Sequence, residues 1–196
     1  MRLRHTRLSL YWGLAVLAWA AAPVFARQHA AQDPGGFRDG GQATISACDR
    51  RATVSTYNGL GINADTLTAS KAIIGELWTA TLTPQLDRGP GLWAIFLRDS
   101  STQGTVVDLG ILLFDNPAGP TELLVEGETL FNSPSAVHLG GGSPSGGPVA
   151  LVPNRCSLIG QTWCAQAIVF GDLPFDFVFD IDPQLSSAVE GVVGSF

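Results

Sequence analysis

The residues of this chain that could carry acid–base catalysis are few. A serine hydrolase needs a histidine to accept the proton of its serine, and His138 is the one histidine beyond residue 45. It alternates with two apolar residues in the segment 136–139, AVHL, so we expect its imidazole on the solvent-facing side of a strand. No G-x-S-x-G motif, which exposes the nucleophile of many hydrolases, surrounds Ser143 or Ser145. The sequence therefore predicts no catalytic residues.

The acidic residues gather near the C-terminus. In the predicted strand 175–182, apolar residues alternate with aspartates, so one face is apolar and the other acidic. Calcium takes six to eight oxygen ligands, which makes these carboxylates a candidate cation site. Residues on one face of a strand stand about 7 Å apart, however, which is too far for short side chains to converge on one ion. We therefore expect a solvated acidic face without a metal, formed by Asp172, Asp176, Asp180 and Asp182.

Three cysteines, Cys48, Cys156 and Cys164, allow at most one intramolecular disulfide and leave one thiol over. All three pairings are open, and Cys156 with Cys164 would close the shortest loop. A zinc site is the alternative use of cysteine. The chain has no C-x-x-C motif, and its histidines are far from the cysteines in sequence, so we do not expect zinc.

Two glycine-rich segments invite a nucleotide-binding interpretation. The segment 59–64, GLGINA, matches a loose dinucleotide fingerprint and follows a predicted strand, but no helix follows it to hold a pyrophosphate. The segment 140–147 lacks the Lys-Ser/Thr pair of a phosphate-binding loop. We expect both to be turns and expect no cofactor.

Three tryptophans beyond the first 26 residues, Trp78, Trp93 and Trp163, could stack on sugar rings. All three lie in segments that we predict to be core strands. Because large aromatic side chains are more often buried than displayed, we expect them to pack in the core.

The elements that must position these residues are predicted to be short strands. Apolar residues alternate with polar ones at a period of two, for example in 78–83, WTATLT, and turns rich in Gly, Pro and Asn separate the runs. Two nearly continuous apolar runs, in 92–97 and 163–170, are typical of central strands. The segment 104–114 fits either a strand or a short helix. The pattern predicts an all-β, antiparallel two-sheet sandwich, with the other strands at 52–57, 121–126, 136–139, 149–152 and 187–193.

The first 26 residues predict a secretory signal peptide. Three arginines precede an uncharged apolar stretch, 8–22, and the small residues Val24 and Ala26 favour cleavage after Ala26. The stretch is shorter than the ~20 residues that an uncleaved membrane anchor needs. We therefore expect residues 1–26 to form a signal-peptide helix that is removed, 27–45 a flexible segment, and 46–196 a single domain outside the cytoplasm.

The charge balance is acidic. The chain carries a formal charge of −6, which becomes −9 once the leader and its three arginines are removed. Nucleic-acid binding needs a basic surface, and Lys71 is the sole lysine. We expect neither a nucleic-acid partner nor a membrane association of the mature chain.

Several motifs occur together along the chain. They are 52–64, ATVSTYNGLGINA, the segments 74–81 and 122–125, a P-N-x3-L-x-G-x5-Q pattern starting at Pro153, and the segments 185–188 and 193–194. In these motifs the sequence resembles a group of uncharacterised exported bacterial β-sandwich domains. The resemblance implies a secreted sandwich and assigns no catalytic residue. Such domains often carry cysteines shortly after the N-G-x-G-x-N motif and near the last strand, where this chain has Ala64 and Ser186, so their usual disulfide is not implied here.

The residues of the P-N-x3-L-x-G-x5-Q pattern, which we call the signature, have architectural roles. Pro153 and Asn154 would end a strand, Leu158 would close one end of the core, and Gly160 would let the backbone reverse. Together with the lack of a reactive cluster, they favour a secreted, non-enzymatic protein of adhesion, surface structure or interaction. The alternatives are a carbohydrate-binding or calcium-dependent binding module and, third, an extracellular hydrolase; the partner would be an extracellular protein or glycan.

Overall fold

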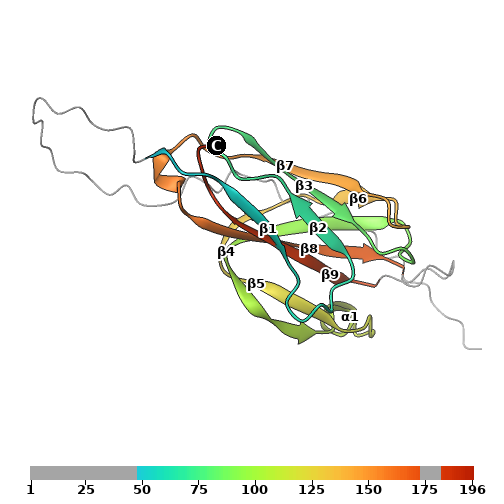
Figure 1. The fold of residues 1–196 in the computed structure, drawn as a ribbon. Helices are drawn as coiled ribbons and strands as arrows, with labels where there is room; N and C mark the ends of the chain where they lie inside the picture. The colour runs from blue at the N-terminus through green and yellow to red at the C-terminus, as the bar shows by residue number, and fades with distance from the viewer. Residues whose placement is uncertain (1–47, 173–181) are drawn as a thin grey trace, which may run out of the picture.

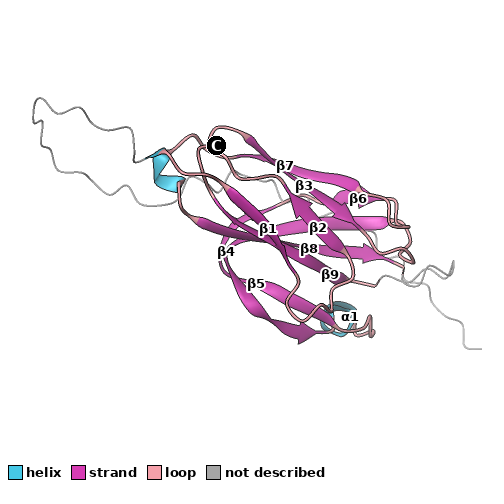
Figure 2. Cartoon of the chain, in the orientation of Figure 1, coloured by secondary structure: helices cyan, strands magenta, loops and turns pink. Residues whose placement is uncertain are grey.

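The computed structural model describes residues 48–172 and 182–196, and they fold as two stacked antiparallel sheets (Figures 1 and 2). The larger sheet has the order β1-β9-β8-β4-β5, with β6 also paired to β4, and the smaller has the order β2-β3-β7. This confirms the predicted all-β sandwich. The elements are β1 (Thr53–Tyr57), β2 (Thr66–Ala69), β3 (Leu77–Thr83), β4 (Gly91–Val107), α1 (Leu109–Phe114), β5 (Thr121–Asn132), β6 (Ala136–His138), β7 (Ser145–Leu151), the 3-10 helix η3 (Cys156–Leu158), β8 (Thr162–Gly171) and β9 (Gln184–Val192).

The main core lies between the sheets and contains the three tryptophans. Trp78, Trp93 and Trp163 are each at most 3% exposed, which confirms that they are core residues. Trp78 on β3 meets Trp163 on β8 edge to face, with ring centroids 5.6 Å apart, so this contact joins the two sheets. The tryptophans therefore offer no stacking surface for a sugar.

The two strands predicted to be central do occupy the middle of the larger sheet. β8 is buried along most of its length, as expected of a strand covered on both faces. In β4 the prediction holds less well, because Leu92 is 41% exposed and only Trp93 and Ile95 are fully buried.

The second half of β4 forms an arm with β5. The first half of β4 pairs with β8 as far as Arg98, and the remainder pairs with β5 alone, with register shifts between Leu97 and Thr105. A second cluster of buried residues, Leu124, Val125, Cys164 and Ala188, connects this arm to β8 and β9. Because Cys164 alternates with the core-facing Trp163 and Ala165, this cluster lies on the outer face of the larger sheet.

The segment 104–114, which fitted either a strand or a helix, contains both. β4 ends at Val107, and Asp108 then caps α1 by accepting a hydrogen bond from the Ile111 N–H. The Asp108 carboxylate also accepts from the backbone N–H groups of Ala118 and Gly119. These bonds, led by the one from Ala118, keep the pKa of Asp108 below its usual value. One aspartate thus fixes both ends of the α1 turn.

The disulfide joins Cys48 to Cys156 across a sequence separation of 108 residues. The shortest-loop pairing of Cys156 with Cys164 is therefore wrong. Cys164 is 1% exposed in the middle of the larger sheet, under the arm, whereas Cys156 lies in η3 beyond the end of β7. Burial, and secondarily the charge of Glu190, raises the pKa of the Cys164 thiol to about 12, so this thiol is unreactive in the folded protein.

Several predictions fall partly or wholly outside the described residues. The signal peptide 1–26, the segment 27–45 and the aspartates Asp176 and Asp180 lie there. Of the acidic group, Asp172 and Asp182 are described, and Asp182 is 8% exposed. Within 48–172 and 182–196, no group of three or more His, Cys, Asp and Glu side chains is placed to hold a metal ion.

Candidate functional site

His138 is buried, contrary to the predicted solvent-facing position. Its side chain is 0% exposed and its Nε2 lies 2.8 Å from the Phe170 carbonyl oxygen, while Val137 and Leu139 are 65% and 72% exposed. The alternation is as predicted, but the inner and outer faces are exchanged, because β6 brings the imidazole against the end of β8. His138 is thus a core histidine and belongs to no Ser-His-Asp arrangement in the described residues.

The position of His138 predicts an acid-sensitive stability. Burial, assisted by the charge of Arg88, lowers the pKa of His138, while the Phe170 carbonyl and Asp65 act in the opposite direction. The unfolded chain therefore binds a proton at this imidazole at a higher pH than the native chain. Its contribution to stability is complete above the unfolded pKa of ~6.5 and is lost as the pH falls below that value.

The comparison is with a His138→Gln variant, whose side-chain amide can still donate to Phe170. Urea unfolding at pH 7.5 and at a pH about two units lower should show a larger loss of stability for the natural chain than for the variant. Protonation of carboxylates lowers the stability of both proteins equally, so the difference between the two losses reports on His138. Equal losses would show that His138 is not responsible.

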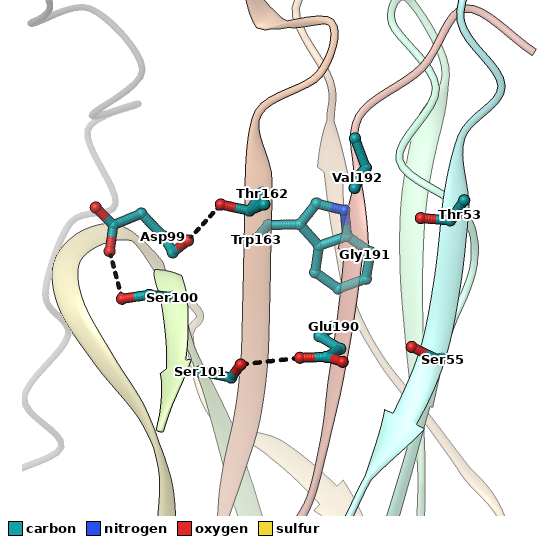
Figure 3. Close-up of a pocket in the computed structure, with 10 residues that line it drawn as sticks. All are labelled: Thr53, Ser55, Asp99, Ser100, Ser101, Thr162, Trp163, Glu190, Gly191 and Val192. Atoms are coloured by element: carbon teal, nitrogen blue, oxygen red, sulfur yellow. Dashed lines mark hydrogen bonds between the residues drawn. The ribbon is translucent and has the colours of Figure 1, made fainter. Parts of the chain in front are cut away.

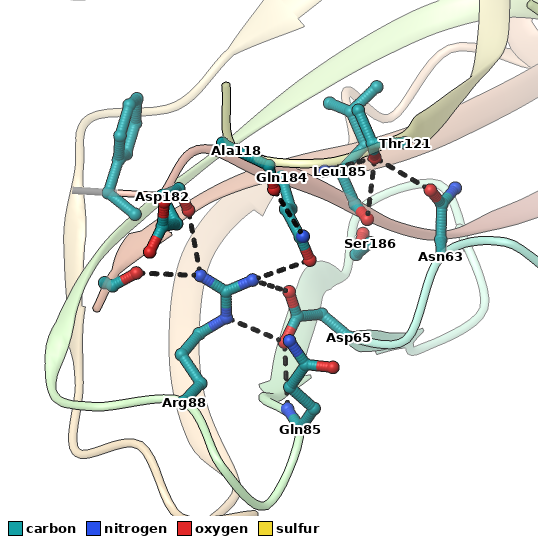
Figure 4. A network of polar contacts seen from close by, with 12 residues as sticks. Asn63, Asp65, Gln85, Arg88, Ala118, Thr121, Asp182, Gln184, Leu185 and Ser186 are labelled. Atoms are coloured by element: carbon teal, nitrogen blue, oxygen red, sulfur yellow. Dashed lines mark hydrogen bonds and ion pairs between the residues drawn. The ribbon is translucent and has the colours of Figure 1, made fainter. Parts of the chain in front are cut away.

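A buried ion pair closes one end of the sandwich (Figure 4). Asp65, just before β2, and Arg88, in the β3–β4 connection, are both 0% exposed at their side chains and lie 3.0 Å apart. The Arg88 Nη1 donates to the carbonyls of Gly171 and Asp182, and its Nη2 donates to the Gln184 side chain. Asp65 also accepts from the Gln85 N–H. The pair therefore holds together segments from both sheets.

The turn that follows β1 is fixed by a second buried polar group. Gly59 and Gly61 have positive φ, and β2 follows the segment in place of a helix, which confirms the prediction that 59–64 is a turn. The side chain of Asn63 donates to the Glu122 carbonyl and accepts from the Glu122 N–H. The buried Glu122 carboxylate in turn accepts from the Leu60 N–H. The turn is thereby attached to β5.

Gln166 connects β5 to β8 and β9. This side chain is 0% exposed on β8, where its amide donates to the carbonyls of Glu122 and Ser186 and accepts from the Leu124 N–H. Gln166 thereby joins three strands. The predicted architectural roles are confirmed for two other residues of the signature, since Leu158 packs on the main core and Gly160 adopts a φ of +88°.

The first candidate binding surface is a polar trough on the outer face of the larger sheet (Figure 3). Its volume is about 350 Å³, and β1, β9 and β8 form its floor while the bend of β4 forms one wall. Its lining, as far as the described residues form it, is rich in hydroxyl groups and holds two carboxylates but no Lys or Arg. The members are Thr53, Ser55, Asp99, Ser100, Ser101, Thr162, Trp163, Glu190, Gly191 and Val192.

The second candidate surface is an exposed apolar ridge on α1. Ile111, Leu112, Leu113 and Phe114, which we call the α1 ridge, are 52%, 66%, 51% and 51% exposed. Asp108 and Asp115 flank the ridge at the two caps of the helix. Neither surface was predicted from the sequence: the ridge lies in the segment left between strand and helix, and the trough forms only when four strands meet.

Comparisons with family models, with curated proteins and with solved structures gave no match. In the described part of the chain, no helix has the length and hydrophobicity to cross a bilayer.

Proposed function

We propose that this chain is an exported, non-enzymatic β-sandwich that acts in interaction or adhesion outside the cytoplasm, with the α1 ridge as the contact surface. The observation that carries the proposal is the display of four consecutive large apolar side chains, each more than half exposed. Contiguous apolar side chains on the surface of a soluble protein mark a place where a partner binds.

The ridge is held in a defined shape. Asp108 accepts hydrogen bonds from both sides of the turn, and the Asp115 backbone closes the helix in a left-handed conformation with its N–H bonded to the Ile111 carbonyl. Because the backbone that presents the ridge is already ordered, binding a partner costs little further backbone entropy. The flanking carboxylates favour a protein partner whose apolar contact is bordered by basic residues.

The non-enzymatic part of the proposal is supported by the use of the buried polar side chains. Asp65, Arg88, Asn63, Gln166 and His138 each hydrogen-bond to residues of other strands or loops and thereby hold the sandwich together. Catalysis would require such groups to converge on an accessible cavity.

The proposed location is supported by two features. The leader 1–26 has the organisation of a secretory signal. The Cys48–Cys156 disulfide suits an oxidising compartment, because the cytosol keeps most thiols reduced. An N-terminal sequence of the exported chain that begins at Arg27 is expected; retention of the leader would contradict this part.

The ridge is tested with a Leu112→Ser/Leu113→Ser variant. The natural chain should cross-link to an extracytoplasmic protein of its host. The yield of that product should fall at least about tenfold in the variant, since each leucine buried at a contact contributes roughly 1.5–3 kcal/mol. The matched control is Val149→Ser/Leu151→Ser, because those residues are 55% and 61% exposed on β7. The proposal fails if both variants retain the product, or if both lose it equally.

A further inference from the structure

We infer that the polar trough on the larger sheet is a binding site for a neutral sugar, recognised through its hydroxyl groups. The trough is separate from the α1 ridge, and the inference does not depend on the function proposed for that ridge. Its volume of about 350 Å³ lies in the range of small-molecule sites.

The two carboxylates of the trough are held in place by its own hydroxyl groups. The Ser101 hydroxyl donates to Glu190 Oε2 over 2.9 Å, and the Ser100 hydroxyl donates to Asp99 Oδ1 over 3.2 Å (Figure 3). The Glu128 N–H also donates to Asp99 Oδ1, and Thr162 donates to the Asp99 carbonyl. Each carboxylate oxygen can accept more than one hydrogen bond, so both groups keep capacity for a ligand hydroxyl.

The part of the floor that β1 forms supplies groups that both donate and accept. Thr53 and Ser55 lie on β1, are exposed, and stand across from Val192 and Glu190 in the register of the sheet. A hydroxyl group is at once a donor and an acceptor. The trough therefore presents acceptors on one side and mixed groups on the other, which matches the hydroxyl groups of a sugar.

Trp163 lines the floor of the trough but gives it no hydrogen-bonding side chain. Its indole lies on the core side of the larger sheet, edge to face with Trp78 of the smaller sheet. Recognition of a ligand in the trough therefore rests on the hydroxyl groups and the two carboxylates.

The charges of the lining residues favour some classes of ligand over others. Among the described residues, no Lys or Arg lines the trough, so Asp99 and Glu190 would repel a phosphate, a sulfate or a sugar acid. A cation would satisfy the carboxylates but leave the hydroxyl donors of Thr53 and Ser55 unused. A neutral sugar uses all of them. Because Trp163 is buried, recognition would proceed through hydrogen bonds and not through stacking.

The experiment uses the isotope-labelled mature chain and follows backbone amide signals by NMR during titration with methyl glycosides of glucose, galactose and mannose. At least one should shift the amides of Thr53, Ser55 and Glu190 together along one saturation curve. Glu190→Gln should weaken this binding by about tenfold, because a charge-assisted hydrogen bond becomes a neutral one. Ser55→Ala should also weaken it.

The matched control is Thr68→Ala, which removes an exposed hydroxyl from the opposite sheet and should leave the affinity unchanged. Glucosamine and glucuronate serve as the cationic and anionic comparison ligands. The inference is overturned if no neutral glycoside shifts the trough amides at its solubility limit, if the shifts map elsewhere, or if glucosamine or glucuronate binds more tightly than every neutral glycoside. Unfolding curves of each variant establish that it is folded.

Discussion

Replacing Arg88 with methionine should lower the free energy of unfolding by about 3–5 kcal/mol, because it leaves the Asp65 carboxylate buried without its counter-charge. The substitution also removes the donors that reach the carbonyls of Gly171 and Asp182 and the side chain of Gln184. Urea unfolding followed by tryptophan fluorescence measures the change, and the unfolding slope should stay constant if the native state keeps its compactness.

Two further variants separate charge from geometry. Arg88→Lys keeps the charge but not the planar arrangement of donors, so it should recover only part of the lost stability. The double variant Asp65→Leu/Arg88→Met removes both charges and should be more stable than Arg88→Met alone. If Arg88→Met unfolds at the same urea concentration as the natural chain, the ion pair does not hold the sandwich end together.

Removing the disulfide with Cys48→Ser/Cys156→Ser should cost about 2–5 kcal/mol. The cross-link spans 108 residues, and a link across so long a stretch removes much of the conformational freedom of the unfolded chain. It also connects the beginning of the described chain to η3, close to the point where Gly160 reverses toward β8. The measurement is the denaturation midpoint under non-reducing conditions.

The control for that variant is Cys164→Ala, which leaves the disulfide intact. It removes a buried sulfur from the second cluster, so it should cost less than the loss of the cross-link. Reducing agent should destabilise the natural chain and Cys164→Ala alike but leave Cys48→Ser/Cys156→Ser unaffected. A natural chain that is insensitive to reduction would contradict the assignment.

The strands were predictable where a local pattern carries the information. The alternation in 78–83 gave β3, and the apolar run in 163–170 gave β8, because each pattern matches one arrangement of faces. β2 was not predicted, since four residues, Thr66–Ala69, are too short for a period to stand out. The start of β7 at Ser145 lies in a segment rich in Gly and Pro that was predicted to be a turn.

Alternation alone could not decide which face of β6 is inside. Val137 and Leu139 are the more apolar residues, yet His138 is the buried one, because its ring meets the carbonyl of Phe170 on a strand 32 residues away. The pairing of Asp65 with Arg88 and the pairing of the cysteines could not be predicted from local patterns either. Nothing within a few residues of Arg88 indicates its partner; the closure of the two sheets brings the pair together.

The two candidate surfaces could not be predicted from the sequence, for related reasons. The trough combines residues of β1, β4, β8 and β9, so its existence depends on strand order, which a local pattern does not give. The α1 ridge has the composition of a core strand, and only the position of α1 outside the sheets leaves it exposed. The signature was the better guide, since the roles predicted for Leu158 and Gly160 agree with the structure.

The side-chain amides of Asn63 and Gln166 occupy backbone groups of Glu122 and Leu124 on β5, the last strand in its sheet. A terminal strand with open N–H and C=O groups can recruit a strand from a neighbouring molecule and start fibre growth. Here those groups are already satisfied within the molecule over this stretch. The chain thereby gains protection against self-templated aggregation at that edge.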